Sequence, residues 1–471
     1  MASQWLPIAE IAAKVQTGEL KAVDLVETAL KTIEEKSEFK AIIVTTAERA
    51  RARAIAVDAG DNRGRLAGVP FIAKDNFLVF GADTTAASNI LKGFDAPYQA
   101  SAIEKLEAEG AICVAKANLD AFGHGASTEN SDFFTTVNAH DKTRVSGGSS
   151  GGSATSVALH LAPFALGTDT GGSSRQPASF SGVVGFKPTY GLISRSGVVA
   201  MGSSLDTIGT MTASVEDLAL VVDIMAGRDG LDATSIERDE SSYTDVATDL
   251  KGKKIGVIKE YMAEGVDEVV KAQINAALDK LIAAGAEVTE VSIPSLPMAL
   301  AVYYIICPAE VSSNLSRYDG QRFAHHYPDA KNLDESYMKS RSTGFGKEAK
   351  RRIMIGTYVL SSGYYDAYYK KAQIVRTLLI NEFKEAFQRV DFLAGPVAPT
   401  TAFKIGENAN DPLQMYLADI LTVAANLVGV PSISIPAGTA EGLPVGLQIM
   451  APQRADRQLL QLAAQAEELL A

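Results

Sequence analysis

The amino-acid sequence predicts an α/β fold, because helical periods and short apolar strands alternate along the chain. Residues 101–116 predict a helix that stops at Gly110 and a short apolar strand over 111–115. A second unit starts with strand 254–258 and a helix with apolar residues at helical spacing. After Gly285 it ends in strand 286–293. This order is that of a βαβ unit.

Both ends of the chain carry further elements. Residues 8–35 predict two helices separated near Gly18, and we expect them to pack as part of an N-terminal helical arm or cap over residues 1–60. We expect residues 61–471 to form one large domain, continuous with the arm. Three apolar runs near prolines predict further core strands toward the C-terminus: residues 392–394, 432–435 and 445–450.

Composition excludes several classes of protein. Hydrophobic residues make up 46% and charged residues 21% of the 471 residues, which is typical of a folded globular enzyme. The net charge of -12 argues against a protein that binds nucleic acid on its own, because phosphate binding needs clustered Lys and Arg. We therefore expect any contact with RNA to need a partner.

Cysteine and histidine usage predicts neither a disulfide framework nor a metal site. Cys113 and Cys307 are far apart in sequence, which fits a reducing cytoplasm. The five histidines show no zinc-ligand spacing. The N-terminus lacks a signal-peptide pattern, and no 18-residue apolar stretch occurs, so we expect a cytoplasmic protein without a membrane span.

A glycine- and serine-rich segment, residues 146–153, precedes an apolar, helix-like segment, residues 154–166. A flexible linker would be flanked by polar sequence, so that interpretation is disfavoured. A phosphate loop would need GxxxxGK[ST], which is absent. Residues 147–151 do match the GxSxG nucleophile elbow, which would require His325 or His326 as the base.

Three separated motifs occur in register. Lys74 ends the run Gly-Val-Pro-Phe-Ile-Ala-Lys, Ser149 lies in the glycine-rich segment, and Ser173 lies in Gly-Thr-Asp-Thr-Gly-Gly-Ser. With this spacing the sequence resembles the amidase-signature enzymes over nearly its whole length. The resemblance implies that residues 61–471 are the catalytic domain, in which helices wrap a mixed central β-sheet. It also implies a Ser–Ser–Lys triad whose middle serine follows a cis peptide bond.

These residue types suit amide hydrolysis. A serine hydroxyl is a poor nucleophile at neutral pH, so Ser173 needs a base within reach, and no histidine is placed to serve. Lys74 can act as that base if burial without a carboxylate partner keeps it neutral, and Ser149 would relay the proton. Backbone amides of Thr170, Gly171 and Gly172, through Ser173, would form the oxyanion hole. We expect the neighbouring Asp169 and Arg175 to hold this loop.

The resemblance narrows to the A subunits of the glutamyl-tRNA(Gln)/aspartyl-tRNA(Asn) amidotransferases. For this group it implies glutamine as substrate, with Arg352 on the α-carboxylate, Asp419 on the α-ammonium and Tyr303 adding a hydroxyl. Ser174 and residues 133–140 depart from the usual sequence motifs of the family. The motifs that narrow the resemblance are residues 127–131, 187–191, 203–206, 314–320 and 350–369.

The same resemblance implies partners. Ammonia would pass to a B subunit that activates Glu-tRNA(Gln) with ATP and Mg²⁺, while a small C subunit clamps the two, and this chain would need no cofactor of its own. The tRNA would be bound mainly by the B subunit. The alternative is a free-standing amidase of the same family acting on another small carboxamide. A non-catalytic scaffold is disfavoured because all three triad residues are present.

Overall fold

An 11-stranded sheet forms the centre of the protein. The structure is a computed structural model that describes residues 5–239, 241–246, 249–409 and 411–471. The strand order is β1-β3-β2-β4-β6-β5-β10-β11-β9-β7-β8. The strands are β1 Ile42–Thr45, β2 Pro70–Lys74, β3 Ile112–Ala117, β4 Phe164–Asp169, β5 Val184–Lys187, β6 Thr207–Thr212, β7 Lys254–Ile258, β8 Glu287–Val291, β9 Phe392–Pro396, β10 Ser432–Ala440 and β11 Leu443–Met450.

The sheet is mixed. β2 runs parallel to both β3 and β4, and β7 runs parallel to both β8 and β9. Antiparallel pairs through β6, β5, β10 and β11 join these two parallel groups. The pairing of β5 with β10 connects strands that are more than two hundred residues apart in sequence. The predicted α/β fold with a mixed central sheet wrapped by helices is confirmed.

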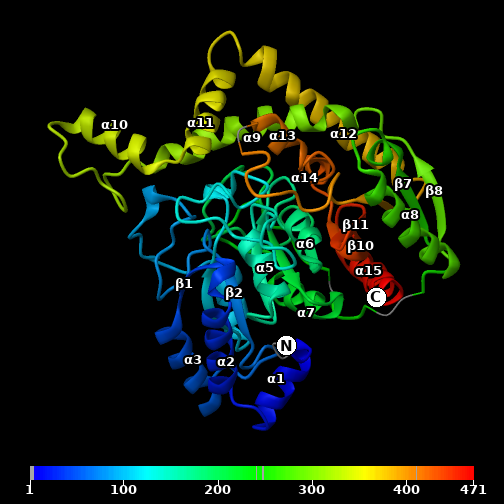
Figure 1. Ribbon diagram of the computed structural model, residues 1–471, viewed down its shortest axis with the longest axis horizontal. Helices are drawn as coiled ribbons and strands as arrows, with labels where there is room; N and C mark the ends of the chain where they lie inside the picture. The colour runs from blue at the N-terminus through cyan, green and yellow to red at the C-terminus, as the bar shows by residue number, and fades with distance from the viewer. Residues whose placement is uncertain (1–4, 240, 247–248, 410) are drawn as a thin grey trace.

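Helices pack along the whole sheet: α2 and α3 against β3, α5 against β4, α7 against β6, and α8 and α15 against β10. Figure 1 shows α5 and α6 at the centre and α10 extending away from the body. The α-helices are α1 Ile8–Thr17, α2 Ala22–Glu35, α3 Ala47–Ala59, α4 Ser101–Ala108, α5 Gly151–Ala158, α6 Arg175–Ser181, α7 Val215–Met225, α8 Glu268–Ala283, α9 Ala299–Asn314, α10 Leu333–Gly344, α11 Lys347–Leu360, α12 Lys371–Ala386, α13 Pro412–Leu417, α14 Val423–Val428 and α15 Asp456–Leu470.

Most elements predicted from periodicity are present, including both N-terminal helices, the βαβ unit and the C-terminal strands. The helix-like interpretation of residues 154–166 is wrong at its end, because α5 stops at Ala158 and residues 164–166 start β4. β4 lies between β2 and β6 and is buried along its length, so its sequence carries no alternation that would mark a strand. Within residues 1–60, β1 joins the common sheet beside β3, and the boundary at residue 60 stays a prediction.

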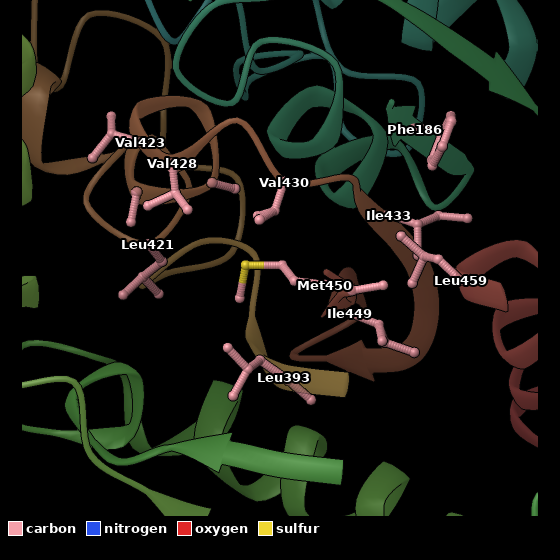
Figure 2. Close-up of a cluster of buried hydrophobic side chains, with 14 of the residues drawn as sticks. Phe186, Leu393, Leu421, Val423, Val428, Val430, Ile433, Ile449, Met450 and Leu459 are labelled. Atoms are coloured by element: carbon pink, nitrogen blue, oxygen red, sulfur yellow. The ribbon is translucent and has the colours of Figure 1, made fainter. Parts of the chain in front are cut away.

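The largest core cluster lies where β9, β10 and β11 meet α14 and α15. Leu393, Ile433 and Ile449 project from the three strands, and Val423 and Leu459 come from the two helices (Figure 2). These side chains are at most a few per cent exposed, so the C-terminal elements are firmly packed onto the sheet.

One helical segment, Leu296–Arg317, is long and apolar enough to span a membrane by composition, with a mean hydropathy of 1.3. It consists of α9 with a 3-10 turn at each end, and half of it is buried inside the protein. α9 packs against α11, α12 and α14, which is the environment of a core helix.

Candidate active site

The three motifs converge at one edge of the sheet. Lys74 is the last residue of β2 and Asp169 the last of β4, and because these strands are parallel neighbours their carboxyl ends lie together. The glycine-rich segment leads into α5, and the loop with Ser173 leads into α6. The amide of Ser150 donates to the carbonyl of Ser173 at 3.1 Å, which brings the two loops into contact.

Lys74 is fully buried and surrounded by hydroxyl groups. Its Nζ lies 2.7 Å from Ser149 Oγ, 2.9 Å from Ser150 Oγ and 2.9 Å from Thr168 Oγ1. The Ser150 hydroxyl donates to the carbonyl of Thr168, so toward Lys74 it can only accept. A neutral amine has two N–H groups and one lone pair. Donation to Ser150 and Thr168 therefore leaves the lone pair for the proton of Ser149.

The surroundings of Lys74 favour the neutral amine. Burial lowers the pKa of Lys74 to about 7, and the negative charges of Asp120, Asp169 and Asp206 only partly oppose this effect. Within the described ranges no carboxylate lies close enough to Lys74 to form an ion pair. A substantial fraction of the lysine can therefore accept a proton near neutral pH.

The loop with Ser149 is fixed from several sides. The peptide bond between Gly148 and Ser149 is cis, as the resemblance implies. The Gly148 amide donates to Gln176 Oε1 at 2.9 Å, and Thr128 Oγ1 donates to the carbonyl of Gly147 at 2.7 Å. All residues from 146 to 157 are buried, which excludes a flexible linker. A Cβ added to Gly148 would overlap the carboxylate of Asp120, so the close approach requires glycine there.

Ser173 is the most accessible member of the triad, with 7% of its surface exposed against 1% for Ser149 and none for Lys74. This order of exposure is expected if Ser173 contacts the substrate and Ser149 and Lys74 do not. No hydrogen bond to the Ser173 hydroxyl occurs among the described residues, so the group is free for a reacting partner.

The loop before Ser173 is anchored by side chains. Thr170 Oγ1 donates to Asp206 Oδ1 at 2.7 Å, and Thr422 Oγ1 donates to the carbonyl of Gly171 at 2.6 Å. The amide of Gly172 donates to Asp169 Oδ1 at 2.9 Å. For Gly172 the structure thus differs from the expectation of a free oxyanion donor, because the buried carboxylate lies within reach of its amide.

Tyr303, Arg352 and Asp419 come from three distant elements. Tyr303 lies on α9 and packs against the loop before Ser173, since a Cβ added to Gly171 would lie 2.8 Å from the tyrosine hydroxyl. Arg352 lies on α11, and its Nε donates to Glu348 Oε1 at 2.9 Å. Asp419 follows α13. The structure therefore brings these predicted residues to the side of the site formed by α9 and α11.

Two buried charged groups here each have one atom without a hydrogen-bond partner among the described residues. Arg352 is 2% and Asp419 7% exposed, and neither Arg352 Nη1 nor Asp419 Oδ1 has a hydrogen-bond partner in the described structure. They do not pair with each other. Burial raises the pKa of Asp419 well above its usual range, although the charge of Arg352 opposes this shift. Buried polar atoms are nearly always bonded, so both atoms are available to a ligand.

A cavity of about 210 Å³ lies beside Arg352. Its walls include Asp120, His124, Glu348, Tyr304 and Tyr416. The guanidinium carbon of Arg352 lies 5.4 Å from the centre of the Tyr304 ring and 5.7 Å from that of Tyr416. The size suits a small polar molecule.

Comparisons with known proteins agree with this geometry. The family model described as Amidase matches residues 24–460. This chain belongs to the amidase family. A curated relative, the A subunit of the glutamyl-tRNA(Gln) amidotransferase of Koribacter versatilis (strain Ellin345), is 50% identical over 464 residues, which is 97% of each chain. The resemblance stated from the motifs is thereby confirmed.

Solved structures of amidotransferase A subunits and amidases also resemble this amidase. The A subunit of the glutamyl-tRNA(Gln) amidotransferase from Thermotoga maritima matches with a TM-score of 0.78 and 40% identity, over 94% of this chain and 91% of that one. A protein described as an amidase matches with a TM-score of 0.84 and 30% identity, over 99% of this chain and all of that one.

The nucleophile-elbow interpretation finds no support in this amidase. His325 Nε2 lies 3.1 Å from Thr343 Oγ1, and His326 Nδ1 lies 3.0 Å from the carbonyl of Gly320, so both rings have partners outside the serine loops. In the part of the chain that the structure describes, no group of three or more His, Cys, Asp or Glu side chains is arranged to hold a metal ion.

Several site residues were not predicted from the sequence. Ser150 and Thr168 contact Lys74 and lie inside the two motifs, so their hydroxyl groups were a usable signal. Asp120, whose amide donates to the carbonyl of Ser149, and Thr422 are distant in sequence from the triad. Nothing in their local pattern marks them.

Proposed function

We propose that this amidase is the glutamine-hydrolysing A subunit of a tRNA-dependent amidotransferase that converts Glu-tRNA(Gln) to Gln-tRNA(Gln). One observation carries the choice of substrate: Arg352 Nη1 and Asp419 Oδ1 are buried atoms of groups of opposite charge, and neither has a partner among the residues that the structure describes. Free glutamine carries an α-carboxylate and an α-ammonium besides its amide. A selective pocket for it needs one fixed cation and one fixed anion.

In this proposal each charge has one partner. The α-carboxylate binds Arg352, and the α-ammonium binds Asp419. The positive charge of the ammonium favours the ionised form of Asp419, which burial disfavours when the site is empty. Tyr303, next to the oxyanion loop, adds a hydroxyl between this end of the substrate and its amide. The amide carbon then lies against Ser173.

Ser173 acts as the nucleophile. Its Oγ attacks the amide carbon while its proton passes to Ser149, and the proton of Ser149 passes to the lone pair of Lys74. The 2.7 Å contact between Lys74 and Ser149 supports the second transfer. The negative charge that develops on the amide oxygen is stabilised by the oxyanion loop. Thr170, Gly171 and Ser173 supply its free amides, with Gly172 added only if its bond to Asp169 opens.

Ammonia leaves when the relay runs backward. Lys74 returns its proton through Ser149 to the departing nitrogen, and a glutamyl ester remains on Ser173. Water then attacks the ester with the same relay as base, which releases glutamate and restores the serine. One proton relay thus serves both halves of the reaction.

The partner assignments follow the relatives. Chains about 50% identical to this one over 97% of its length are named as the A subunits of glutamyl-tRNA(Gln) amidotransferases. We therefore propose a B subunit that receives the ammonia, binds the tRNA and uses ATP and Mg²⁺, together with a C subunit that holds the two. This chain carries out only the glutaminase step.

A reconstitution experiment tests the proposal. The chain is purified alone and co-expressed with B and C subunits, and conversion of Glu-tRNA(Gln) to Gln-tRNA(Gln) is measured with glutamine as the only nitrogen source. We expect conversion only with the three chains, ATP and Mg²⁺ present, and none with Ser173→Ala unless ammonium salt is added. Efficient hydrolysis of other small amides by the lone chain, with no conversion by the complex, would instead establish a free-standing amidase.

A further inference from the structure

His124 is a buried histidine whose ring has no partner. It follows the 3-10 turn η3, Ala121–Gly123, and its backbone is fixed, because its amide donates to Ala121 and its carbonyl accepts from Asn130 Nδ2 at 2.8 Å. The side chain is completely buried, yet neither Nδ1 nor Nε2 has a hydrogen-bond partner among the residues the structure describes. Buried imidazoles normally form hydrogen bonds, so this ring is available to a ligand.

His124 shares a cavity with Arg352, and the residue before it in the chain lies near the proposed relay serine. His124 and Arg352 line the same cavity of about 210 Å³. The residue before it, Gly123, packs against the relay serine, since a Cβ added to Gly123 would lie 3.5 Å from Ser149 Oγ. His124 therefore belongs to the segment that connects the Arg352 cavity with the proposed relay.

Three carboxylates on the cavity wall, those of Asp120, Glu348 and Glu129, each already have at least one donor, although Glu129 Oε2 has none among the described residues. Asp120 accepts from the amides of Thr128 and Asn130, at 2.9 and 3.0 Å. Glu348 accepts from Arg352 and from Tyr416, and Glu129 accepts from an amide through Oε1. His124 thus shares this cavity with a guanidinium nitrogen that also lacks an acceptor in the described structure.

Electrostatics fix the protonation state of the ring. Burial lowers the pKa of His124 well below its usual value, and the positive charge of Arg352 lowers it further. The imidazole is therefore neutral and keeps one N–H as a donor. A neutral donor that lines the same cavity as Arg352 Nη1, with no acceptor for either among the described residues, is suited to a carboxylate.

We propose that His124 is a substrate-binding residue that donates a hydrogen bond to the α-carboxylate of glutamine, next to Arg352. This inference rests on the proposed function, because it assigns a second donor to the same substrate group. The carboxylate then lies between a charged and a neutral donor, which selects for an amide that carries a carboxylate at this position.

The test compares two substrates. Glutamine carries the α-carboxylate, and 4-aminobutanamide has the same chain and amine without it. In His124→Leu we expect kcat/KM for glutamine to fall about 10- to 100-fold, mainly through KM, while kcat/KM for 4-aminobutanamide changes less than about 2-fold. His124→Gln keeps an N–H donor and should recover most of the glutamine activity. His326→Leu is the matched control, since that ring bonds to a carbonyl outside the cavity.

Two further measurements exclude a merely structural role. Thermal unfolding shows whether each variant folds, and if His124→Leu does not, His124→Met against His124→Gln makes the same comparison. In an Arg352→Ala background, His124→Leu should cost less on glutamine than in the parent, because both side chains hold one carboxylate. Equal losses on both substrates, or no loss on glutamine, would overturn the inference. A parent enzyme that fails to hydrolyse glutamine while the His124 variants fold would overturn the proposed function itself.

Discussion

Asp169 and Arg175 form a completely buried, two-pronged ion pair directly beside the proposed nucleophile. Arg175 Nη2 lies 2.9 Å from Asp169 Oδ1 and Nε lies 3.0 Å from Oδ2. The guanidinium also donates to Asn426 at 2.7 Å and to Gln448 at 2.6 Å, both from the C-terminal third of the chain. The same carboxylate holds the amide of Gly172. The proposed oxyanion loop is thus fixed by a polar network that reaches to α14 and β11.

Removing the charge of Asp169 should destabilise the protein strongly. Asp169→Asn leaves Arg175 buried without a counter-charge, and breaking such a pair costs about 3 to 5 kcal/mol of unfolding free energy. Burial alone would raise the pKa of Asp169, but Arg175 outweighs it and holds the pKa far below its usual range. The contribution is therefore present at neutral pH and is lost only as the pH falls through that low value. Urea unfolding at pH 7 measures the loss.

An exposed ion pair provides the control. Arg457 Nη2 lies 2.6 Å from Asp245 Oδ2, and the aspartate side chain is 62% exposed. Asp245→Asn should change the unfolding free energy by less than about 1 kcal/mol. Similar losses in the two variants would show that burial of the Asp169 pair adds nothing.

Substitutions in the proposed triad and at the two histidines should have opposite effects on glutaminase activity. Ser173→Ala should lower ammonia release from glutamine by at least about 10⁴-fold, and Lys74→Ala should do nearly the same, because members of a relay act as a unit. His325→Ala and His326→Ala should leave most of the activity, since their rings contact a threonine and a carbonyl elsewhere. Turnover in the four variants decides between them. An active Ser173→Ala together with an inactive histidine variant would move the nucleophile to Ser149.

The pH dependence should follow Lys74. Only the neutral amine accepts a proton, and burial lowers the pKa of Lys74 to about 7, so kcat/KM for glutamine should rise along a limb near pH 7. An ascending limb near the solvated value of about 10.4 would contradict a buried base. The stability of the protein should also rise with pH because of Lys74. Between pH 7 and the unfolded value the unfolded chain binds more protons, so the parent should gain stability with rising pH relative to Lys74→Met.

The sequence predicted local elements better than their assembly. Helix and strand periods with glycine stops, as in residues 101–116 and 254–293, depend on neighbouring residues alone, and these elements are present. The strand order could not be predicted from the sequence, because the pairing of β5 with β10 joins residues far apart in the chain. β4 was missed for a different reason. Its apolar residues are buried on both faces and continue the apolar character of the preceding helix.

For the site, the resemblance to the amidase-signature enzymes selected the proposed triad, and packing determined the surrounding contacts. Lys74, Ser149 and Ser173 were selected by this resemblance, and the structure places them at one edge of the sheet. The engagement of Gly172 by a carboxylate depends on the conformation of one loop, which a sequence pattern does not specify. That the ring of His124 lines a cavity without a partner among the described residues is visible only in the folded structure.

Substrate choice gives the last prediction, which separates a glutaminase from a general amidase. Arg352→Ala and Asp419→Ala each leave one charge of glutamine unmatched, and a hydrogen bond to a charged group contributes about 1.5 to 3 kcal/mol. Each variant should therefore lose roughly 10- to 150-fold in kcat/KM for glutamine.

An uncharged amide tests whether these losses concern recognition. Neither Arg352 nor Asp419 bonds to Lys74, Ser149 or Ser173, so the relay should be intact in both variants. Propionamide, hydrolysed slowly by the parent, should be turned over about as well by either variant. The ratio of kcat/KM for the two substrates isolates the charged groups in the transition state. Equal losses on both would mean that the two residues support the fold, because a guanidinium packed on two tyrosine rings, once removed, would disturb the neighbouring loop regardless of what is bound.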